Sequence, residues 1–304
     1  MVSLETQLGP LKLKNPVLTA SGTFGYGQEL EQFLDLSQLG AIVCKTVTRH
    51  PRAGNAPPRT CETPAGMLNA IGLQNVGIEK FISDKLPYLR DFDVPLIVNV
   101  AGESVEDFAF LVRELSTHAG IAAIELNISC PNVAHGLDFA TDPALAEEVV
   151  AHAVASTHLP IITKLSPNVT DISVIARAAE QGGAHALSMV NTFVGMAVNI
   201  RTRRPRISNI TGGLSGPAIK PLALRAVYRC AQTVQIPIIG IGGISTAEDA
   251  LEFLIAGASA VQIGTATFVQ PDAAIRMIEG IRNYCHINGI ADVKELVGSL
   301  MTNH

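Results

Sequence analysis

The chain has no tryptophan, few aromatic residues and little charge for its length, and each shortage argues against a class of protein. Charged residues make up 16% of the 304 positions and hydrophobic residues 47%, a balance that disordered or fibrous chains do not have. The formal net charge is -5, so the clustered basic surface of a nucleic-acid-binding protein is not expected. One short basic run, from Arg201 to Arg206, is interpreted as a solvated loop.

Long apolar runs and paired cysteines are also missing. No stretch approaches the roughly 18 apolar residues of a membrane span. The first residues after Met1 alternate polar and apolar side chains as far as Lys14, so a secretory signal is not predicted. Without a C-x-x-C pair, neither a zinc site nor an iron–sulfur cluster is expected, and the chain is predicted to bind no metal and to work in a reducing cytoplasm. The cysteines are scattered at Cys44, Cys61, Cys130, Cys230 and Cys285.

Strand-like and helix-like runs alternate along the whole chain, which is typical of repeated βα units. Eight short runs rich in Val and Ile are predicted to be strands buried on both faces. Eight parallel strands close a barrel that has no edge. The predicted fold class is therefore α/β, a single (β/α)8 TIM barrel forming one domain over residues 1–304. The predicted strands are residues 16–20, 41–46, 95–100, 122–127, 160–165, 186–190, 237–241 and 260–263.

Local signals mark helix ends and turns between these strands. Ser104 is predicted to begin one helix, and Ser245 to Glu248 reads as a capping box that begins another. Gly182-Gly183 and Gly257 are predicted to end helices before the next strand. The first segment, residues 4–13, is predicted to form a short hairpin that plugs the bottom of the barrel.

Three connections are much longer than the usual two to six residues of such loops. They cover residues 48–75, 129–142 and 191–217, and each follows the C-terminal end of a predicted strand. Because active sites of these barrels lie at that end, the long loops are expected to surround the site.

Polar residues recur at the C-terminal ends of the predicted strands, where a barrel brings them into one ring. A lone Asn at such a place is usually a turn former, but a ring of them is not explained in that way. Lys45 and Lys164 are the informative pair, because lysine is rarely buried without a partner. The alternative for both is an ion pair with a barrel carboxylate such as Glu125. The ring consists of Ser21, Lys45, Thr46, Asn99, Asn127, Lys164, Asn191 and Thr192.

Glycines follow the last two strands. Gly242-Gly243 comes after the seventh strand and Gly264-Thr265 after the eighth. Free backbone amides there, beside a helix N-terminus, form the phosphate site that these barrels share. The sequence therefore predicts a phosphate-bearing cofactor.

The segment from Asn127 to Asn132, Asn-Ile-Ser-Cys-Pro-Asn, places Cys130 just beyond the fourth strand. Pro131 favours an extended conformation for Cys130, and neighbouring hydroxyl and amide groups surround the thiol. A thiol can act as a base once its thiolate is favoured. A nucleophilic role is the alternative, for which His135 on the same loop could fold back. The other four cysteines are interpreted as structural.

At these residues the sequence resembles the dihydroorotate dehydrogenases of pyrimidine biosynthesis, and the resemblance covers essentially the whole chain. A generic flavin barrel would share the glycine pairs but not the Asn-rich segments. The segments that carry it are Thr19-Ala-Ser-Gly-Thr-Phe24, Asn69-Ala-Ile-Gly-Leu-Gln-Asn75, the Cys130 motif, Lys164-Leu-Ser-Pro-Asn168, Asn191-Thr192 and Thr211-Gly-Gly-Leu-Ser-Gly-Pro217.

The resemblance implies one FMN per chain and a site for dihydroorotate. The implied FMN contacts are Ser21, Lys45, Thr46, Asn99, Asn127, Lys164, Val190, Gly216, Gly242, Gly243, Gly264 and Thr265. Amide side chains suit the alternating N–H and C=O groups of the substrate ring, since they both donate and accept. The implied substrate contacts are Lys45, Asn69, Ala70, Ile71, Gly72, Leu73, Asn127, Asn132, Asn191 and Thr192.

The implied reaction oxidises dihydroorotate to orotate. Cys130 would take the proton from carbon 5 as the catalytic base, and flavin N5 would take the hydride from carbon 6. Lys164 would lie near flavin N1 and O2, where negative charge develops, and Lys45 would hold substrate and flavin in register. The loop 129–142 would close over the substrate and exclude water.

Within the family, Gln74 and the segment Asn191 to Ala197 resemble the NAD-linked class. In that class the catalytic chain pairs with a subunit carrying FAD and a [2Fe-2S] cluster, and we expect a homodimer of this chain within a heterotetramer. The alternative is the fumarate-linked class, which needs no partner subunit. The quinone-linked class has a helical extension and a Ser base, and the sequence predicts neither for this chain. A dihydrouridine synthase would need a basic face for RNA, and a non-catalytic scaffold would not gather this polar ring.

Overall fold

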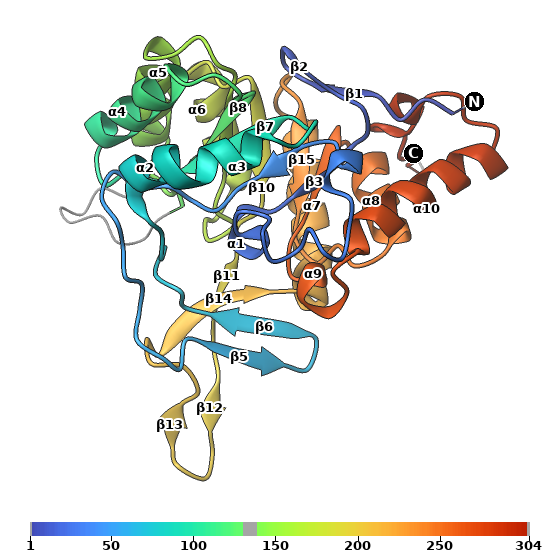
Figure 1. Cartoon of the computed structure of the whole chain (residues 1–304). Coiled ribbons are helices and arrows are strands. Elements are labelled where there is room, and N and C mark those ends of the chain that lie inside the picture. The colour runs from blue at the N-terminus through green and yellow to red at the C-terminus, as the bar shows by residue number, and fades with distance from the viewer. Residues whose placement is uncertain (1, 130–138, 303–304) are drawn as a thin grey trace.

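A computed structural model describes residues 2–129 and 139–302, and its centre is a barrel of parallel strands (Figure 1). The strands neighbour one another in the order β3-β16-β15-β10-β9-β8-β7-β4, and a parallel bridge between Leu18 and Ala41 joins the two ends. The predicted (β/α)8 barrel is confirmed. Its strands are β3 (Val17–Thr19), β4 (Ile42–Val43), β7 (Leu96–Val100), β8 (Ala123–Asn127), β9 (Ile161–Lys164), β10 (Ala186–Met189), β15 (Ile238–Ile241) and β16 (Ala260–Ile263).

All eight predicted strands are present, and only the second is much shorter than predicted. β4 ends at Val43, whereas the prediction extended to residue 46. The reason is that the backbone N–H of Lys45 donates to the carbonyl of Gly25, 2.8 Å away, and so makes no ladder bond to a barrel strand. Lys45 therefore leaves the ladder early.

Helices cover the outside of the barrel and bury their apolar faces against the strands. In the described part of the chain, no helix has the length and apolar character needed to cross a membrane. The long helices are α4 (Val105–Ser116), α5 (Pro143–Ala155), α6 (Ile172–Gln181), α7 (Lys220–Ala231), α8 (Ala247–Ile255) and α10 (Ala273–Ile287). The short ones are α1 (Ser21–Phe24), α2 (Gly77–Lys80), α3 (Leu86–Arg90) and α9 (Ala266–Val269), with single turns at Leu36–Gln38, Phe81–Lys85, Pro217–Ile219 and Val293–Leu296.

The predicted helix ends are confirmed except for one cap. Ser104 caps α4 by accepting from the backbone of Asp107 at 3.2 Å, and Gly183 and Gly257 follow helices with φ of 90° and 119°. The capping box of α8, however, was predicted one residue too early. Thr246 is the N-cap, because its hydroxyl accepts from Asp249 N at 3.2 Å while the Asp249 carboxylate accepts from Thr246 N at 2.9 Å. The same carboxylate accepts from Ser245 N, so Ser245 lies outside the helix.

The interior of the barrel is apolar toward the N-terminal ends of its strands. One layer comes from alternate strands and consists of Leu18, Ile97, Ile162 and Ile239, and the other strands supply smaller residues such as Ala123 and Ala186. The hairpin of β1 (Thr6–Leu8) and β2 (Leu11–Leu13) packs its leucines against this cluster and closes that end of the barrel, as predicted. Figure 1 shows the hairpin at the end of the barrel opposite the long loops.

The two longest connections pair with each other, which the sequence did not predict. One contributes β5 (Thr60–Thr63) and β6 (Gly66–Asn69), the other β11 (Phe193–Met196) and β14 (Thr211–Ser215). They form an antiparallel sheet in the order β11-β14-β6-β5 beyond the C-terminal ends of the barrel strands (Figure 1). The long loops thus form a structured cover over one side of the mouth.

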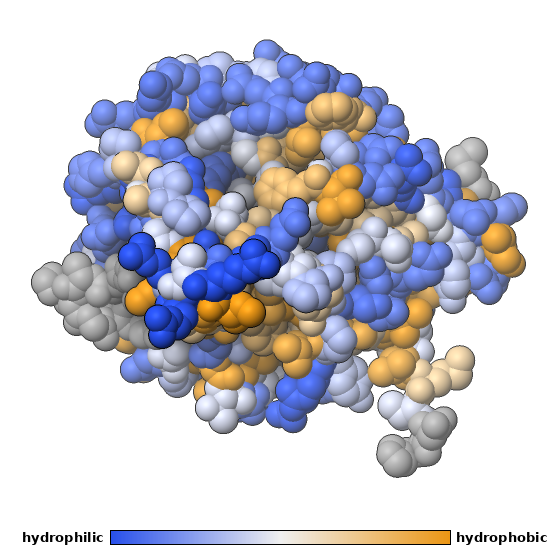
Figure 2. Space-filling view, turned by 90° about the horizontal axis from the view of Figure 1, so that it is seen from below, coloured by the Kyte–Doolittle hydropathy of each residue, from blue (hydrophilic) through white to orange (hydrophobic). Residues whose placement is uncertain are grey.

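A second hairpin, of β12 (Val198–Asn199) and β13 (Arg204–Pro205), extends from this sheet and carries the basic run predicted as a solvated loop. Its arginines are exposed, but Arg204 belongs to a short strand. The exposed Val198 and Ile200 lie beside them. Seen from below, strongly hydrophilic residues stand next to apolar ones on this face (Figure 2).

Candidate active site

A cavity of about 740 Å³ opens at the C-terminal ends of the barrel strands, between the barrel and the small sheet. Both long connections and the ends of the strands supply its walls, so residues far apart in sequence meet there. Eighteen of the predicted site residues line it: Ser21, Lys45, Thr46, Asn69, Ala70, Ile71, Gly72, Leu73, Asn127, Lys164, Val190, Asn191, Thr192, Gly216, Gly242, Gly243, Gly264 and Thr265.

Of the other three predicted site residues, one is described and does not line this cavity. Asn99 is fully buried one level below, where its Nδ2 donates to Glu125 Oε1 at 2.6 Å. Cys130 and Asn132 lie outside the described residues, as does His135. Ser129, the last described residue before them, lines the cavity and donates to the carbonyl of Lys164 at 3.3 Å. The polypeptide therefore enters the undescribed segment at the wall of the cavity.

The two lysines differ in their electrostatic surroundings. Lys164 Nζ lies 3.8 Å from Glu125 Oε1, so the ion pair considered from sequence is present for Lys164. Lys45 has no such pair within the described part of the chain. Burial, and then the positive charges of Arg59 and Lys164, lower the pKa of Lys45. A buried ammonium without a carboxylate suits an anionic ligand, which would supply the missing charge.

Glycines in the connections after the sixth and seventh barrel strands bring backbone close to backbone. Gly216, Gly242 and Gly243 have φ of 94°, 125° and 75°, the left-handed region that favours glycine. A Cβ on Gly243 would lie 2.7 Å from Lys220 N, and one on Gly216 would lie 2.7 Å from the Cα of Gly66. These positions accept no side chain without a shift, and they leave backbone amides at the cavity wall, as a phosphate site requires.

Hydrogen bonds between polar side chains and backbone hold the walls of the cavity together. Asn127 pairs with Lys164 in the register of β8 and β9, and its Oδ1 accepts from Asn191 Nδ2 at 3.3 Å. Across the cavity, Asn69 Nδ2 donates to the carbonyl of Gly213 at 3.4 Å. Thr265 donates to Ser215 Oγ at 2.8 Å and ties the end of β16 to β14. The cavity can therefore offer several donors and acceptors to a planar polar ring.

The sequence analysis missed two polar residues in the interior of the barrel. Gln262 lines the cavity although its residue is fully buried, and Ser188 is also buried. Both donate to Glu125 Oε2 at 2.7 Å. Each interrupts a short apolar strand, and that interruption was the available signal, since a strand buried on both faces rarely carries a polar residue without a purpose.

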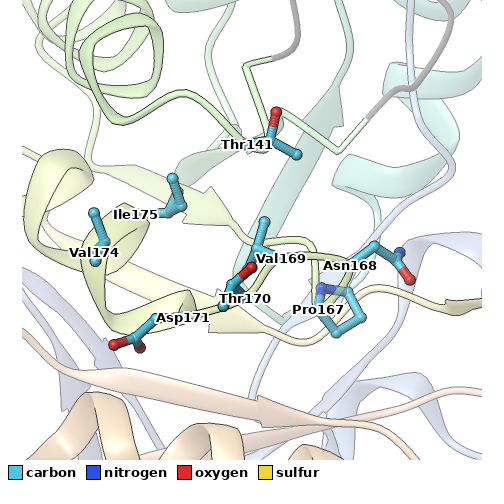
Figure 3. Close-up of a pocket in the computed structure, with 8 residues that line it drawn as sticks. All are labelled: Thr141, Pro167, Asn168, Val169, Thr170, Asp171, Val174 and Ile175. Atoms are coloured by element: carbon cyan, nitrogen blue, oxygen red, sulfur yellow. The ribbon is translucent and has the colours of Figure 1, made fainter.

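A second cavity, of about 630 Å³, lies beside the first and has a different character. Figure 3 shows it between Thr141, which leads into α5, and the loop from Pro167 to Asp171 before α6. Asn168 lines both cavities; its Nδ2 donates to Thr192 O at 3.0 Å and its Oδ1 accepts from Val194 N at 2.9 Å. Because its described lining contains one charged side chain, that of Asp171, the chemistry is assigned to the first cavity.

Two buried cysteines of the described part, Cys44 and Cys230, are unsuited to reaction. Burial raises the pKa of Cys44 to about 12, with the nearby charge of Glu125 acting in the same direction. Burial likewise raises the pKa of Cys230 to about 12. Both thiols are therefore held in the protonated, unreactive form at neutral pH, consistent with the structural role predicted for them. No cluster of three or more His, Cys, Asp or Glu side chains suited to a metal occurs among the described residues.

Comparisons with known proteins agree with the sequence motifs. The family model described as Dihydroorotate dehydrogenase matches residues 3–284. A relative from Geotalea uraniireducens is 55% identical over 300 residues, covering 98% of both chains. A relative from Thermoanaerobacter pseudethanolicus is 54% identical and covers 98% of this chain and 99% of its own length. Both are named dihydroorotate dehydrogenase B (NAD(+)), catalytic subunit. On this coverage and identity, the chain belongs to the dihydroorotate dehydrogenase family.

Proposed function

We propose that this chain is the catalytic subunit of an NAD-linked dihydroorotate dehydrogenase, which oxidises dihydroorotate to orotate in pyrimidine biosynthesis. The observation that carries the proposal is the cavity of about 740 Å³ at the barrel mouth, into which two lysines, several amide side chains and a glycine cradle converge. Relatives that cover nearly the whole chain bear the same name.

Membership of the family implies a flavin, and we propose FMN, one per chain. The residues present fit such a group. The glycine cradle around Gly243 offers backbone amides to a phosphate. At the wall of the cavity, Gln262 Oε1 is buried and has no hydrogen-bond partner among the described residues, so it could accept from a ring N–H. When bound, the flavin supplies the acceptor for the hydride from carbon 6 of the substrate.

The chain's own residues would position the substrate and move its proton. The ammonium of Lys45 is poised for the substrate carboxylate, and Asn69, Asn127 and Asn191 would bind the ring amides. Such a site rejects rings that leave its amides unpaired. Cys130, which follows the cavity-lining Ser129, is proposed to take the proton from carbon 5.

The electrons must then leave the chain. In the described residues we find no ligand set for an iron–sulfur cluster, and the relatives' name, catalytic subunit, implies a partner. We propose that the partner carries FAD and a [2Fe-2S] cluster and passes the electrons to NAD, that this chain forms a homodimer within a heterotetramer, and that the complex is cytoplasmic. Fumarate as the acceptor, without a partner subunit, remains the second candidate from the sequence.

The experiment follows bleaching of the flavin in anaerobic stopped flow. Purified protein is expected to be yellow and to be bleached by dihydroorotate. The Cys130→Ala variant should lose most of this reduction, and Cys130→Ser should retain a little, more at high pH, because a hydroxyl is a weaker base precursor than a thiol. Colourless wild-type protein, or an Ala variant reduced at the wild-type rate, contradicts the proposal. Copurification of a flavin and iron–sulfur protein distinguishes the NAD-linked from the fumarate-linked class.

A further inference from the structure

Glu125 is a carboxylate in the interior of the barrel with no solvent exposure. Three neutral donors reach its two oxygens: Asn99 at 2.6 Å on Oε1, and Ser188 and Gln262 at 2.7 Å on Oε2. They come from three different strands. A buried carboxylate held in this way is fixed in position and orientation, since each oxygen is engaged.

Lys164 stands between this carboxylate and the cavity. It lines the cavity, whereas Glu125 does not, and the two side chains come from neighbouring strands β8 and β9. The distance of 3.8 Å from Nζ to Oε1 is that of an ion pair, but it is longer than the ~3.2 Å limit of a normal N–H···O hydrogen bond. Among the described residues, the Lys164 ammonium donates no hydrogen bond. Its N–H groups therefore remain available to a ligand in the cavity.

Lys164 and Glu125 therefore have different roles. Lys164 presents positive charge to the cavity, and Glu125 holds that charge in place while partly neutralising it from below. A group in the cavity that becomes more negative on reduction would be stabilised by Lys164 and opposed by Glu125. The balance between the two sets how easily that group is reduced.

We propose that Glu125 is a positioning residue for Lys164, which orients its ammonium toward the flavin and sets the flavin's reduction potential to a lower value than Lys164 alone would give. This inference rests on the proposed function, because it takes a flavin to be the group that Lys164 faces. This role requires no contact between Glu125 and the substrate, since Glu125 is fully buried and does not line the cavity.

Glu125→Gln is the direct test, because it removes the charge and keeps the size. The Asn99 amide can turn to accommodate it, since Asn99 Oδ1 has no partner in the described structure and can accept from the new NH₂ group. With the opposing charge gone, reduced flavin should be favoured about tenfold over oxidised flavin, a shift of about +30 mV for a two-electron couple. The midpoint potential is measured against reference dyes in an anaerobic titration.

Thr163→Val is the matched control. Thr163 is fully buried on the same strand as Lys164, and its hydroxyl has no hydrogen-bond partner among the described residues. The substitution therefore changes barrel packing and polarity without touching the ion pair. It should leave the midpoint potential unchanged, whatever it does to stability. A purely structural role for Glu125 predicts the same of Glu125→Gln, which is how the two explanations are separated.

A measurement on flavin-free protein keeps this inference separate from the proposed function. Glu125→Gln leaves Lys164 as a buried charge without its partner, so the melting temperature should fall by several degrees. Adding Lys164→Met should restore part of the loss, because the two substitutions are coupled. If the wild-type protein binds no flavin, the proposed function fails while this coupling can still be observed.

An unchanged or more negative potential in a flavin-loaded Glu125→Gln protein would overturn the inference, and so would full additivity of the two substitutions in melting temperature. Should Glu125→Gln not fold, Glu125→Asp carries the test. Its carboxylate keeps the charge but lies one methylene farther from Lys164, so the potential should shift in the same direction by a smaller amount. No shift in that variant would also count against the proposal.

Discussion

The two ends of the barrel are built from the same eight strands but serve opposite purposes. At the closed end, Ile97 and Ile162 belong to an apolar layer sealed by the N-terminal hairpin. Two residues farther along the same strands, at the open end, stand Asn99 and Lys164. Because side chains alternate along a strand, each pair points to the same interior. Two residues along a strand thus separate side chains that stabilise the fold from side chains that serve the site.

The comparison shows where the free energy comes from and where it is lost. Burying an Ile side chain contributes roughly 1.5–3 kcal/mol, and the closed end has several of them. The open end instead buries an ion pair and a ring of amides, which costs free energy unless each group is partnered. The apolar layer below therefore offsets the cost of the polar layer above.

Lys164→Ala at the open end is expected to have the largest effect. Loss of the ammonium removes charge stabilisation from the cavity, so the protein should purify with little FMN, and the remaining loaded fraction should be reduced by dihydroorotate about 10²–10³-fold more slowly. Flavin absorbance and stopped-flow bleaching measure the two quantities. Lys294→Ala, which breaks an exposed pair with Asp292, serves as the control and should alter neither. A Lys164→Ala variant that retains full FMN and is reduced at the wild-type rate would show that the open end does not depend on this ammonium for function.

Ile162→Ala at the closed end should do the reverse. Ile162 is 1% exposed and packs in the apolar layer, so its truncation is expected to lower the free energy of unfolding by about 2–4 kcal/mol. The rate of flavin reduction in the folded protein should stay within about twofold of wild type. Urea unfolding and stopped flow measure these separately, and Ile162→Val should cost about 1 kcal/mol. An Ile162→Ala variant with wild-type stability but slow flavin reduction would show that the closed end contributes to function as well as to stability.

The barrel itself could be predicted from sequence, because it depends on local signals. Short runs rich in Val and Ile with glycine-marked ends gave all eight strands, and the Gly9-Pro10 turn gave the hairpin. The capping box of α8 was misplaced by one residue, because Ser245 and Thr246 are both good caps, and only the reach of the Asp249 carboxylate decides between them.

Features that depend on contacts between residues far apart in the sequence were harder to predict. The sheet joining β6 to β14 pairs residues more than a hundred positions apart, and neither connection shows a clean strand alternation. The strand ends, by contrast, converge by topology alone, so most predicted site residues do line one cavity. Gln262 and Ser188 were missed because a single polar residue inside a strand says nothing about which carboxylate it meets.

Lys45 gives a smaller effect, which appears in the pH dependence of ligand binding. Its pKa is lowered by burial and by Arg59 and Lys164, so its charge is lost at a lower pH than that of an ordinary lysine. Orotate is an anion, and its binding should therefore weaken as the pH rises through that lowered pKa, by roughly tenfold per unit once Lys45 is neutral. Spectral titration of the flavin with orotate measures the affinity.

The sign for folding is opposite, which provides an internal check. Between the lowered pKa and the ordinary value of 10.5, the unfolded chain binds more protons at this position than the folded one. Lys45 therefore contributes an increase in stability with pH across that window. Lys45→Met should flatten both trends, whereas Lys45→Arg, which stays charged, should keep binding strong at high pH. Unchanged pH dependence in the Met variant would assign the effect to another group.

The smallest predicted effect concerns the hairpin that closes the barrel. Leu11 is only partly buried and packs against the apolar layer from its edge, so Leu11→Ala should lower the free energy of unfolding by about 1 kcal/mol, less than Ile162→Ala. Lys12→Ala, on the exposed face of the same strand, should change it by less than about 0.5 kcal/mol. Urea unfolding compares the two variants. A loss for Leu11→Ala as large as that for Ile162→Ala would mean that the hairpin belongs to the innermost core. In that case the barrel would need its plug as much as its own inward-facing layers.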